Sequence, residues 1–482
     1  MRSGAWLLIG LALASSATAQ IVVTVDVTHA VRTVNTHPFG INTAIWDDQF
    51  VSTATDDVLR RMQAGMLRFP GGSASDEYHW STNRTENSAF AWPADFNAFA
   101  RTATALGADV MITTNYGTGS AEEAAAWVRS ANITSSRGYR YWEIGNEVYG
   151  SWEEDHHARP HDAWTYAEAA ANYIVQMKGV DPSIRIGIPA VPGEDSFANY
   201  DDETVTNPRT GSGHKGWTPL VLSHMRELGM LPDFLSYHRY EQEPFGEDDQ
   251  RLLNAASTWK SDMTSLRQML TDYAGGGGSA IEILCTENNS VSSRPGKQTV
   301  SLVNALYLAD SLAQSLQTEV GTVLWWDLRN GNESMNNNSP ALFGWRVYGD
   351  YGVLSPANER YPTSYLAEMF AAFARPGDTV IDATSNSASL SAYAVSRADA
   401  SLAILLINKN RDQTVDVAIR FNGFNPANGD MPMLSYGMTN DIAQSDITRS
   451  NARLTAVRAD PYSARVIVVP HASGRRRAVG RH

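Results

Sequence analysis

The chain has 482 residues, more than one hydrophobic core of ordinary size accommodates, so we expect at least two domains. With 43% hydrophobic and 19% charged residues its composition is globular, which excludes an intrinsically disordered protein. The formal net charge of −14 would repel a polyanion, so we expect no nucleic-acid partner.

Residues 1–19 have the three regions of a secretory signal peptide. Arg2 supplies the positive charge, Ala5 to Leu13 the apolar run, and Ala17-Thr18-Ala19 a cleavage site of small residues. We expect cleavage before Gln20 and a secreted or periplasmic protein. Elsewhere no run of about eighteen apolar residues occurs, so we expect no membrane association.

From residue 38 to residue 375, short β-rich runs alternate with longer helical patterns. The runs that predict strands are Phe39–Trp46, Met66–Pro70, Asp109–Asn115, Tyr139–Asn146, Ile184–Ala190, Phe234–Tyr240, Ile281–Thr286 and Thr322–Leu328. Among the helical patterns between them are Ala94–Leu106, Ala121–Ser130, Ala163–Lys178, Pro219–Leu228, Arg251–Tyr273 and Val300–Leu316. Eight strands separated by helices predict an α/β fold, a closed (β/α)₈ TIM barrel. The alternative, an open doubly wound sheet, usually has a Gly-rich phosphate turn after its first strand, and none follows Trp46.

The remainder of the chain has a different pattern. Residues 376–472 contain short alternating runs with no helical period, which predict a C-terminal β-sandwich domain, and residues 20–37 are expected to add a strand to it. Residues 473–482 are expected to be a solvated basic tail. Gly275–Gly278, before the seventh barrel strand, predicts a flexible connection.

Two of the predicted barrel strands end on a glutamate. The fourth, in YRYWEIGNEVYG, ends on Asn146-Glu147, and the seventh, in IEILCTENNS, ends on Glu287. Barrel active sites form at the C-terminal ends of the strands, and a facing pair of carboxylates suits cleavage of a glycosidic bond. One carboxyl donates a proton to the leaving oxygen, so we expect its pKa to be raised while the other is charged. Glu143 shares the parity of Glu147 and is expected to be a buried partner of Arg68.

Four motifs in matching strand order resemble glycoside hydrolase clan A, and within it the family 51 α-L-arabinofuranosidases. They are RFPGG on strand two, WEIGNE on strand four, YHRY on strand six and the terminal glutamate of strand seven. The resemblance implies a retaining enzyme in which Glu147 is the acid/base and Glu287 the nucleophile. It also implies substrate-binding roles for Arg68, Asn146, His238, Tyr240 and Trp326.

Within that resemblance, each supporting residue has an implied task. Asn146 would bond the sugar hydroxyl next to the anomeric carbon, and Arg68 would keep the nucleophile ionised. His238 and Tyr240 would bond the nucleophile or line the pocket, and Trp326 would be a stacking platform. Trp325 alternates with it and is expected in the barrel wall. The sequence departs from family 51 at Asn288-Asn289, where a tryptophan commonly follows the nucleophile, which leaves the sugar open.

The residues therefore predict a secreted retaining glycosidase acting on an oligo- or polysaccharide, with α-L-arabinofuranosidase as the first choice. The alternatives are a β-xylosidase, a β-glucuronidase, an endo-glycanase or a non-catalytic carbohydrate-binding protein. Two carboxylates suffice for the chemistry, so we expect no cofactor and no metal. Asp155-His156-His157 and His161 are interpreted as loop residues, because adjacent histidines do not present both rings to one ion. The only cysteine, Cys285, shares the parity of Glu287 and is expected to be buried. The oligomeric state stays open.

Overall fold

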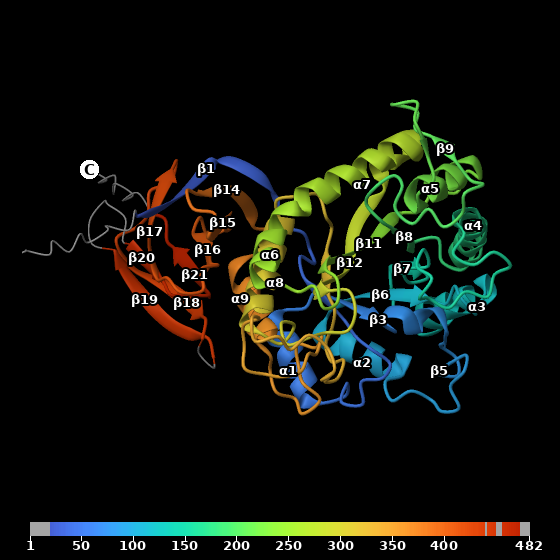
Figure 1. The fold of residues 1–482 in the computed structure, drawn as a ribbon, viewed down its shortest axis with the longest axis horizontal. Helices are drawn as coiled ribbons and strands as arrows, with labels where there is room; N and C mark the ends of the chain where they lie inside the picture. Colours follow the sequence, from blue (N-terminus) through green and yellow to red (C-terminus); the bar gives the residue numbers. More distant parts are fainter. Residues whose placement is uncertain (1–19, 439–440, 450–455, 473–482) are drawn as a thin grey trace, which may run out of the picture.

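The computed structural model describes residues 20–438, 441–449 and 456–472, so the predicted signal peptide and basic tail lie outside the described residues. Eight parallel strands close into a barrel in the order of the chain (Figure 1). They are β2 (Gly40–Asn42), β3 (Met66–Phe69), β6 (Asp109–Thr114), β7 (Tyr141–Ile144), β8 (Arg185–Ala190), β11 (Phe234–Gln242), β12 (Glu282–Val291) and β13 (Val323–Trp325). Each falls on a predicted strand, and β13 pairs with β2 to complete the ring, which confirms the predicted barrel.

Helices surround the barrel. They are α1 (Thr53–Met62), α2 (Phe96–Leu106), α3 (Ala121–Val128), α4 (Ala163–Val180), α5 (Trp217–Glu227), α6 (Asp249–Ala255), α7 (Trp259–Tyr273), α8 (Leu302–Ser315) and α9 (Pro362–Phe373). Six of them begin after a Ser or Asp whose side chain accepts a hydrogen bond from the first helical turn.

Two sequence predictions about these connections are wrong. The single helix expected over Arg251–Tyr273 is divided into α6 and α7, because the Ser257 and Thr258 hydroxyls donate to carbonyls at residues 254 and 255. The four glycines form a 3₁₀ helix, Gly275–Ala280, in which a Cβ on Gly278 would lie 2.1 Å from the Leu270 carbonyl oxygen. Packing is tight at Gly278, whereas Gly276 is exposed and a Cβ there would meet no atom within 4 Å. The segment precedes β12, so it lies at the opposite end of the barrel from the strand C-termini.

The barrel interior is filled in two chemically different layers. Near the N-terminal ends of the strands the layer is apolar, and it consists of Met66, Met111, Phe234, Leu284 and Leu324. Glycines make room for it, because a Cβ on Gly187 would lie 2.0 Å from the Phe234 ring and one on Gly40 2.3 Å from Leu324. Two residues further along each strand, the next side chains that point inward form a polar layer. It consists of Asn42, Arg68, Thr113, Glu143, Ser236 and Thr286. The barrel is therefore a packed core whose C-terminal mouth is polar.

A nine-stranded sheet forms the C-terminal domain, in the order β19-β18-β21-β16-β15-β14-β1-β17-β20. The strands are β1 (Ile21–Thr33), β14 (Thr379–Ser385), β15 (Leu390–Ser396), β16 (Leu402–Asn408), β17 (Val415–Asn422), β18 (Gly429–Tyr436), β19 (Ala443–Arg449), β20 (Ala456–Ala459) and β21 (Ser463–Val469). The N-terminal strand β1 pairs with β14 and β17, as predicted for residues 20–37. Residues from both ends of the sheet share one apolar core, so the sheet curls into a sandwich. Strands β18 and β19 were not predicted, because β18 contains Pro432 and β19 has the polar sequence AQSDITR.

Strand β16 joins the two domains, because both of its faces are buried. Leu402, Ile404 and Leu406 lie in the core of the C-terminal sheet, whereas Ala403, Leu405 and Ile407 pack into the core that continues around the barrel. Helices α8 and α9 form the barrel side of this contact. In the described part of the chain, no helix combines the length and the apolar character needed to span a bilayer.

Candidate active site

Arg68 lies at the centre of the polar layer with no exposed surface. Its Nε donates to Glu143 Oε2 at 2.6 Å, and one terminal nitrogen donates to Glu287 Oε1 at 2.7 Å. The guanidinium also donates to Asn42 at 2.9 Å and to Asn146 at 2.8 Å. Burial alone would lower the pKa of Arg68, but Glu143 and Glu287 raise it above its ordinary value. The predicted Arg68–Glu143 pair is confirmed, and the same guanidinium contacts Glu287.

A bulge in β12 brings Glu287 into the mouth. The register against β11 shifts between Tyr237–Cys285 and His238–Glu287, so one extra residue stands in β12. Thr286 and Glu287 consequently both face the interior, where Thr286 lies 2.8 Å from Ser236 and Glu287 contacts Arg68. The expectation that Cys285 shares the direction of Glu287 is wrong. Cys285 packs in the wall between barrel and helices, where burial raises the pKa of its thiol.

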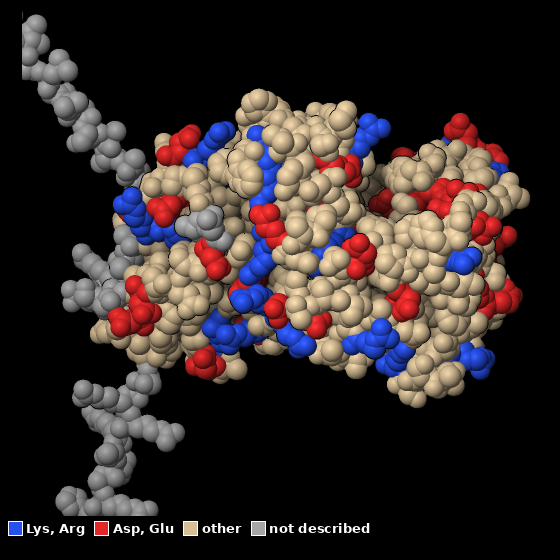
Figure 2. Space-filling view, turned by 90° about the horizontal axis from the view of Figure 1, so that it is seen from below, with Lys and Arg blue, Asp and Glu red and all other residues tan. Residues whose placement is uncertain are grey.

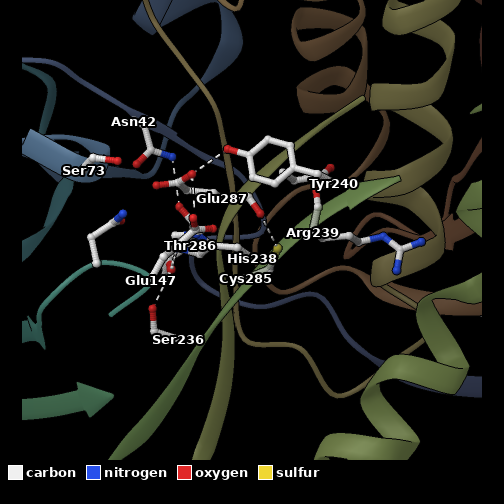
Figure 3. Close-up of polar contacts among 12 residues, drawn as sticks. Asn42, Ser73, Glu147, Ser236, His238, Arg239, Tyr240, Cys285, Thr286 and Glu287 are labelled. Atoms are coloured by element: carbon white, nitrogen blue, oxygen red, sulfur yellow. Dashed lines mark hydrogen bonds and ion pairs between the residues drawn. The ribbon is translucent and has the colours of Figure 1, made fainter. Parts of the chain in front are cut away.

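Glu147 faces Glu287 across the mouth, with His238 between them (Figure 3). Its backbone φ of +42° is in the left-handed region, a strained conformation for a residue with a side chain. His238 Nδ1 lies 2.7 Å from Glu147 Oε1 and 3.5 Å from Glu287 Oε2. One donor atom from each of the three residues lies within 4.8 Å of the others. The structure therefore brings the two predicted carboxylates together.

The pKa of Glu147 in the substrate-free site is lowered, whereas we expected from the sequence that it would be raised. Burial alone would raise it, but the hydrogen bond and charge of His238, with a 2.9 Å bond from Trp152 Nε1, lower the pKa of Glu147. Burial would lower the pKa of His238, but the charges of Glu287 and Glu147 raise it. His238 therefore competes with Glu147 for the proton in the absence of substrate.

Tyr240 and Trp326 complete the mouth on the side of β11 and β13. The Tyr240 hydroxyl donates to Glu287 Oε2 at 2.5 Å. Trp326 is 9% exposed, and its ring lies edge-on to Trp46 with centroids 6.2 Å apart. Gly72 is required beneath this ring, because a Cβ there would lie 2.6 Å from it. Trp325, in contrast, is fully buried in the barrel wall, as predicted.

Glu153 belongs to the site although sequence reasoning missed it. Its Oε1 accepts hydrogen bonds from Asn146 Nδ2 at 2.9 Å and Ser73 Oγ at 3.0 Å, and its Oε2 is buried with no partner among the described residues. Burial raises the pKa of Glu153 well above its ordinary value, and the charges of Asp76 and Glu147 raise it further. The Glu153 carboxyl therefore orients the Asn146 amide. The run SWEED resembles a solvated loop, and only its place after the fourth strand pointed to the site.

Asn288, which stands where family 51 commonly has tryptophan, points away from the mouth. Its Nδ2 donates to the Tyr307 hydroxyl at 3.0 Å, and its Oδ1 accepts from Ser311 Oγ at 3.1 Å, both on α8. The Asn288 side chain therefore lies in the barrel wall and does not line the mouth.

The candidate metal ligands are the two facing carboxylates and the histidine between them. Among the described residues, only Glu147, His238 and Glu287 bring three donor atoms within 4.8 Å, so this set is the one that can hold an ion. His157 lies 2.7 Å from Asp155 and stacks on Tyr116, which makes it a packed loop residue. The predicted loop interpretation of this segment is consistent with that packing.

Comparison with known proteins places this geometry in context. No protein-family model matches the chain. The probable α-L-arabinofuranosidase C of Aspergillus fumigatus is 26% identical over 176 residues, which cover 31% of this chain and 34% of the relative. The match thus spans about a third of the curated relative's length. The α-L-arabinofuranosidase of Thermotoga maritima superimposes with a TM-score of 0.70 at 19% identity, over 93% of this chain and 100% of that one. A family 44 xyloglucanase of Paenibacillus polymyxa gives 0.69 at 13% identity, over 94% and 100%. The chain thus shares its fold, a barrel followed by a β-sheet domain, with both of these glycoside hydrolases. The clan A resemblance of the motifs is confirmed.

Removing the guanidinium of Arg68 is expected to unfold the mouth. In Arg68→Met, Glu143 and Glu287 lose their buried counter-charge, which should lower the free energy of unfolding by roughly 3–5 kcal/mol. The control is Arg61→Met, because the Arg61 side chain is 58% exposed and lies 3.6 Å from Glu368; its cost should stay within about 1 kcal/mol. Urea denaturation measures both, and equal losses would contradict the central role of Arg68.

Glu153 is expected to make stability depend on pH. Because its folded-state pKa is raised, the protonated carboxyl contributes stability that is complete below the ordinary value of 4.5 and is lost as pH rises through the folded pKa. In Glu153→Gln the amide oxygen can still accept from Asn146 and Ser73, but nothing ionises. The melting temperature of the wild type should therefore fall relative to that of the variant as pH rises above 4.5. The neighbouring Asp76 and Glu147 titrate in both proteins, so parallel melting curves would refute the protonated state.

Proposed function

We propose that the chain is a retaining glycoside hydrolase that acts on an oligo- or polysaccharide. The activity that we propose first is that of an α-L-arabinofuranosidase. The observation that carries the proposal is the facing pair Glu147 and Glu287, with donor atoms within 4.8 Å of each other. Retaining glycosidases hold their two carboxyl groups about 5–5.5 Å apart, whereas inverting ones leave room for a water at roughly 6.5–9.5 Å. The spacing thus supports double displacement.

In the first step, Glu287 attacks the anomeric carbon of the sugar. Arg68 and Tyr240 both donate hydrogen bonds to its carboxylate, which fixes its direction. As the carboxylate–carbon bond forms, the bond to the leaving oxygen breaks, and Glu147 donates a proton to that oxygen. The proton reaches Glu147 from its 2.7 Å contact with His238.

In the second step, water replaces the leaving group. Glu147, now a carboxylate, removes a proton from water as the water oxygen attacks the anomeric carbon, and the ester bond to Glu287 breaks. The charge on Glu287 is absent while the ester exists, so less negative charge surrounds Glu147. The proton taken from water passes from Glu147 back to His238 across their 2.7 Å contact, so both carboxylates and the histidine return to their starting states, and the product sugar keeps its configuration.

The choice of arabinofuranose is supported by the relatives. The fungal proteins that match by sequence, and several of the bacterial structures that match by fold, carry the name arabinofuranosidase. The pocket side chains that the motifs singled out, Asn146, His238, Tyr240 and Trp326, all lie around the carboxylate pair. Asn146 presents its amide from a fixed direction, since Arg68 and Glu153 hold its two ends.

Replacing either carboxylate is expected to stop hydrolysis of 4-nitrophenyl α-L-arabinofuranoside. Glu147→Ala should lose about 10²–10⁴ in kcat, because no base then activates the water of the second step. Glu287→Ala should have no normal turnover, but added azide should enter the space of the missing carboxylate, displace nitrophenolate and give the arabinosyl azide of inverted configuration, which NMR identifies.

The matched control for this pair is Glu282→Ala. Glu282 begins the same strand β12 and pairs with Arg185 at 2.8 Å at the other end of the barrel. Its removal should leave kcat/KM unchanged. Wild-type rates in Glu287→Ala would exclude the proposed nucleophile. Cleavage of xyloglucan or xylan without any aryl arabinofuranosidase activity would instead favour an endo-acting enzyme.

We also propose that the protein is exported. The proposal is supported by Arg2, the apolar run that follows it and the small residues before Gln20. When the full chain is expressed in a bacterial host, the protein recovered outside the cytoplasm should begin at Gln20, as read by N-terminal sequencing. Recovery of the intact chain from the cytoplasm alone would contradict export.

A further inference from the structure

A second pocket, of about 440 Å³, lies where the C-terminal domain meets the barrel. Trp345 and Arg346 come from the connection between β13 and α9, and Tyr365 from the first turns of α9. Tyr436 at the end of β18 and Lys297 before α8 complete its wall. None of the residues of the barrel mouth lines this pocket, and its volume is within the range of small-ligand sites.

Aromatic rings, each in contact with another ring or a guanidinium, line part of this pocket. Trp345 is 78% exposed, although the guanidinium of Arg346 lies 4.5 Å from its ring and holds it in place. Tyr365 and Tyr436 are stacked with centroids 5.0 Å apart, and the Arg360 guanidinium lies 4.0 Å from the Tyr365 ring. Large, rigid rings with polar edges suit a ligand that has both apolar faces and hydroxyl groups, as a sugar has.

The charge of the wall is positive in a chain of net charge −14. Lys297 is 8% exposed, and its ammonium donates to the Ser339 carbonyl at 3.3 Å with no described carboxylate within ion-pair distance. Arg346 pairs with Glu359, but its Nε is buried without a partner among the described residues. A buried cation without a counter-charge is costly, so the pocket favours an anionic group. Figure 2 shows several Lys and Arg side chains, with Asp and Glu among them, in the zone where the two domains meet.

We propose that this pocket is a second carbohydrate-binding site, which takes a uronic acid unit of the polysaccharide. The sugar ring packs on Trp345, and its carboxylate pairs with Lys297. The proposed function supplies only the class of polymer to this inference, a polysaccharide. Binding at the second pocket does not require that the barrel mouth be catalytic.

Titration calorimetry of the full chain carrying Glu287→Gln, which cannot turn over, tests the proposal. The probes are xylotetraose bearing one glucuronic acid and the same xylotetraose without it. The acidic probe should bind at least about tenfold more tightly. Adding Trp345→Ala should weaken its binding by about tenfold or more. Adding Lys297→Gln should reduce the affinity for the acidic probe to that for the neutral one. Unchanged affinity in Trp345→Ala, or equal affinity for the two probes, overturns the proposal.

The control is Trp164→Ala, because Trp164 is a partly exposed tryptophan on α4 that stacks on His224 away from the pocket. The affinity of this variant for the acidic probe should equal that of the parent protein. Light scattering of Trp345→Ala reads the mass of the particle, and a fall in mass would show a contact between copies and overturn the sugar site. In the catalytically intact chain, Trp345→Ala should cleave 4-nitrophenyl α-L-arabinofuranoside at the wild-type rate. A wild type that cleaves no aryl glycoside would count against the proposed function alone.

Discussion

The buried guanidinium of Arg68 is the constraint on which the mouth of the barrel depends. Four of its five N–H groups are used, and their acceptors come from β2, from β7 and the loop after it, and from β12. A fully buried cation destabilises the fold unless acceptors from these strands surround it, because each missing acceptor leaves part of its charge uncompensated. The position of Glu287 and the orientation of Asn146 therefore follow from closure of the barrel.

That constraint explains why so much of the site could be read from the sequence. A strand of a parallel barrel is an apolar run, and the residue that ends it faces the mouth, so Glu147 and Glu287 could be assigned from position. Glu143 followed from alternation along its strand, as did the opposite directions of Trp325 and Trp326. The directions of Glu143, Trp325 and Trp326 follow from regular alternation, and they were predicted correctly because the backbone is regular there. Glu147 and Glu287 were found from their place after an apolar run, although a left-handed residue and a bulge set their directions.

The predictions failed where one local interaction interrupts the regular pattern. The β12 bulge reverses the direction of Glu287 relative to Cys285, and no residue type in that strand signals it. Glu153 lies in a polar loop that is folded back under Asn146, a tertiary contact that no local pattern encodes. The break between α6 and α7 depends on the hydroxyls of Ser257 and Thr258, which compete with the helical hydrogen bonds.

One connection links the catalytic mouth to the second pocket. It leaves the barrel at Trp326, beside Glu287, and carries Trp345 to the junction with the C-terminal domain before Pro362 begins α9. Arg346, held between the rings of Trp345 and Tyr361, fixes the far end of this connection against the barrel. A polymer bound at both places would be held at two points, which raises the effective concentration of its glycosidic bonds at the mouth. The C-terminal domain would then contribute to substrate capture as well as stability, because β18 supplies Tyr436 to the same pocket.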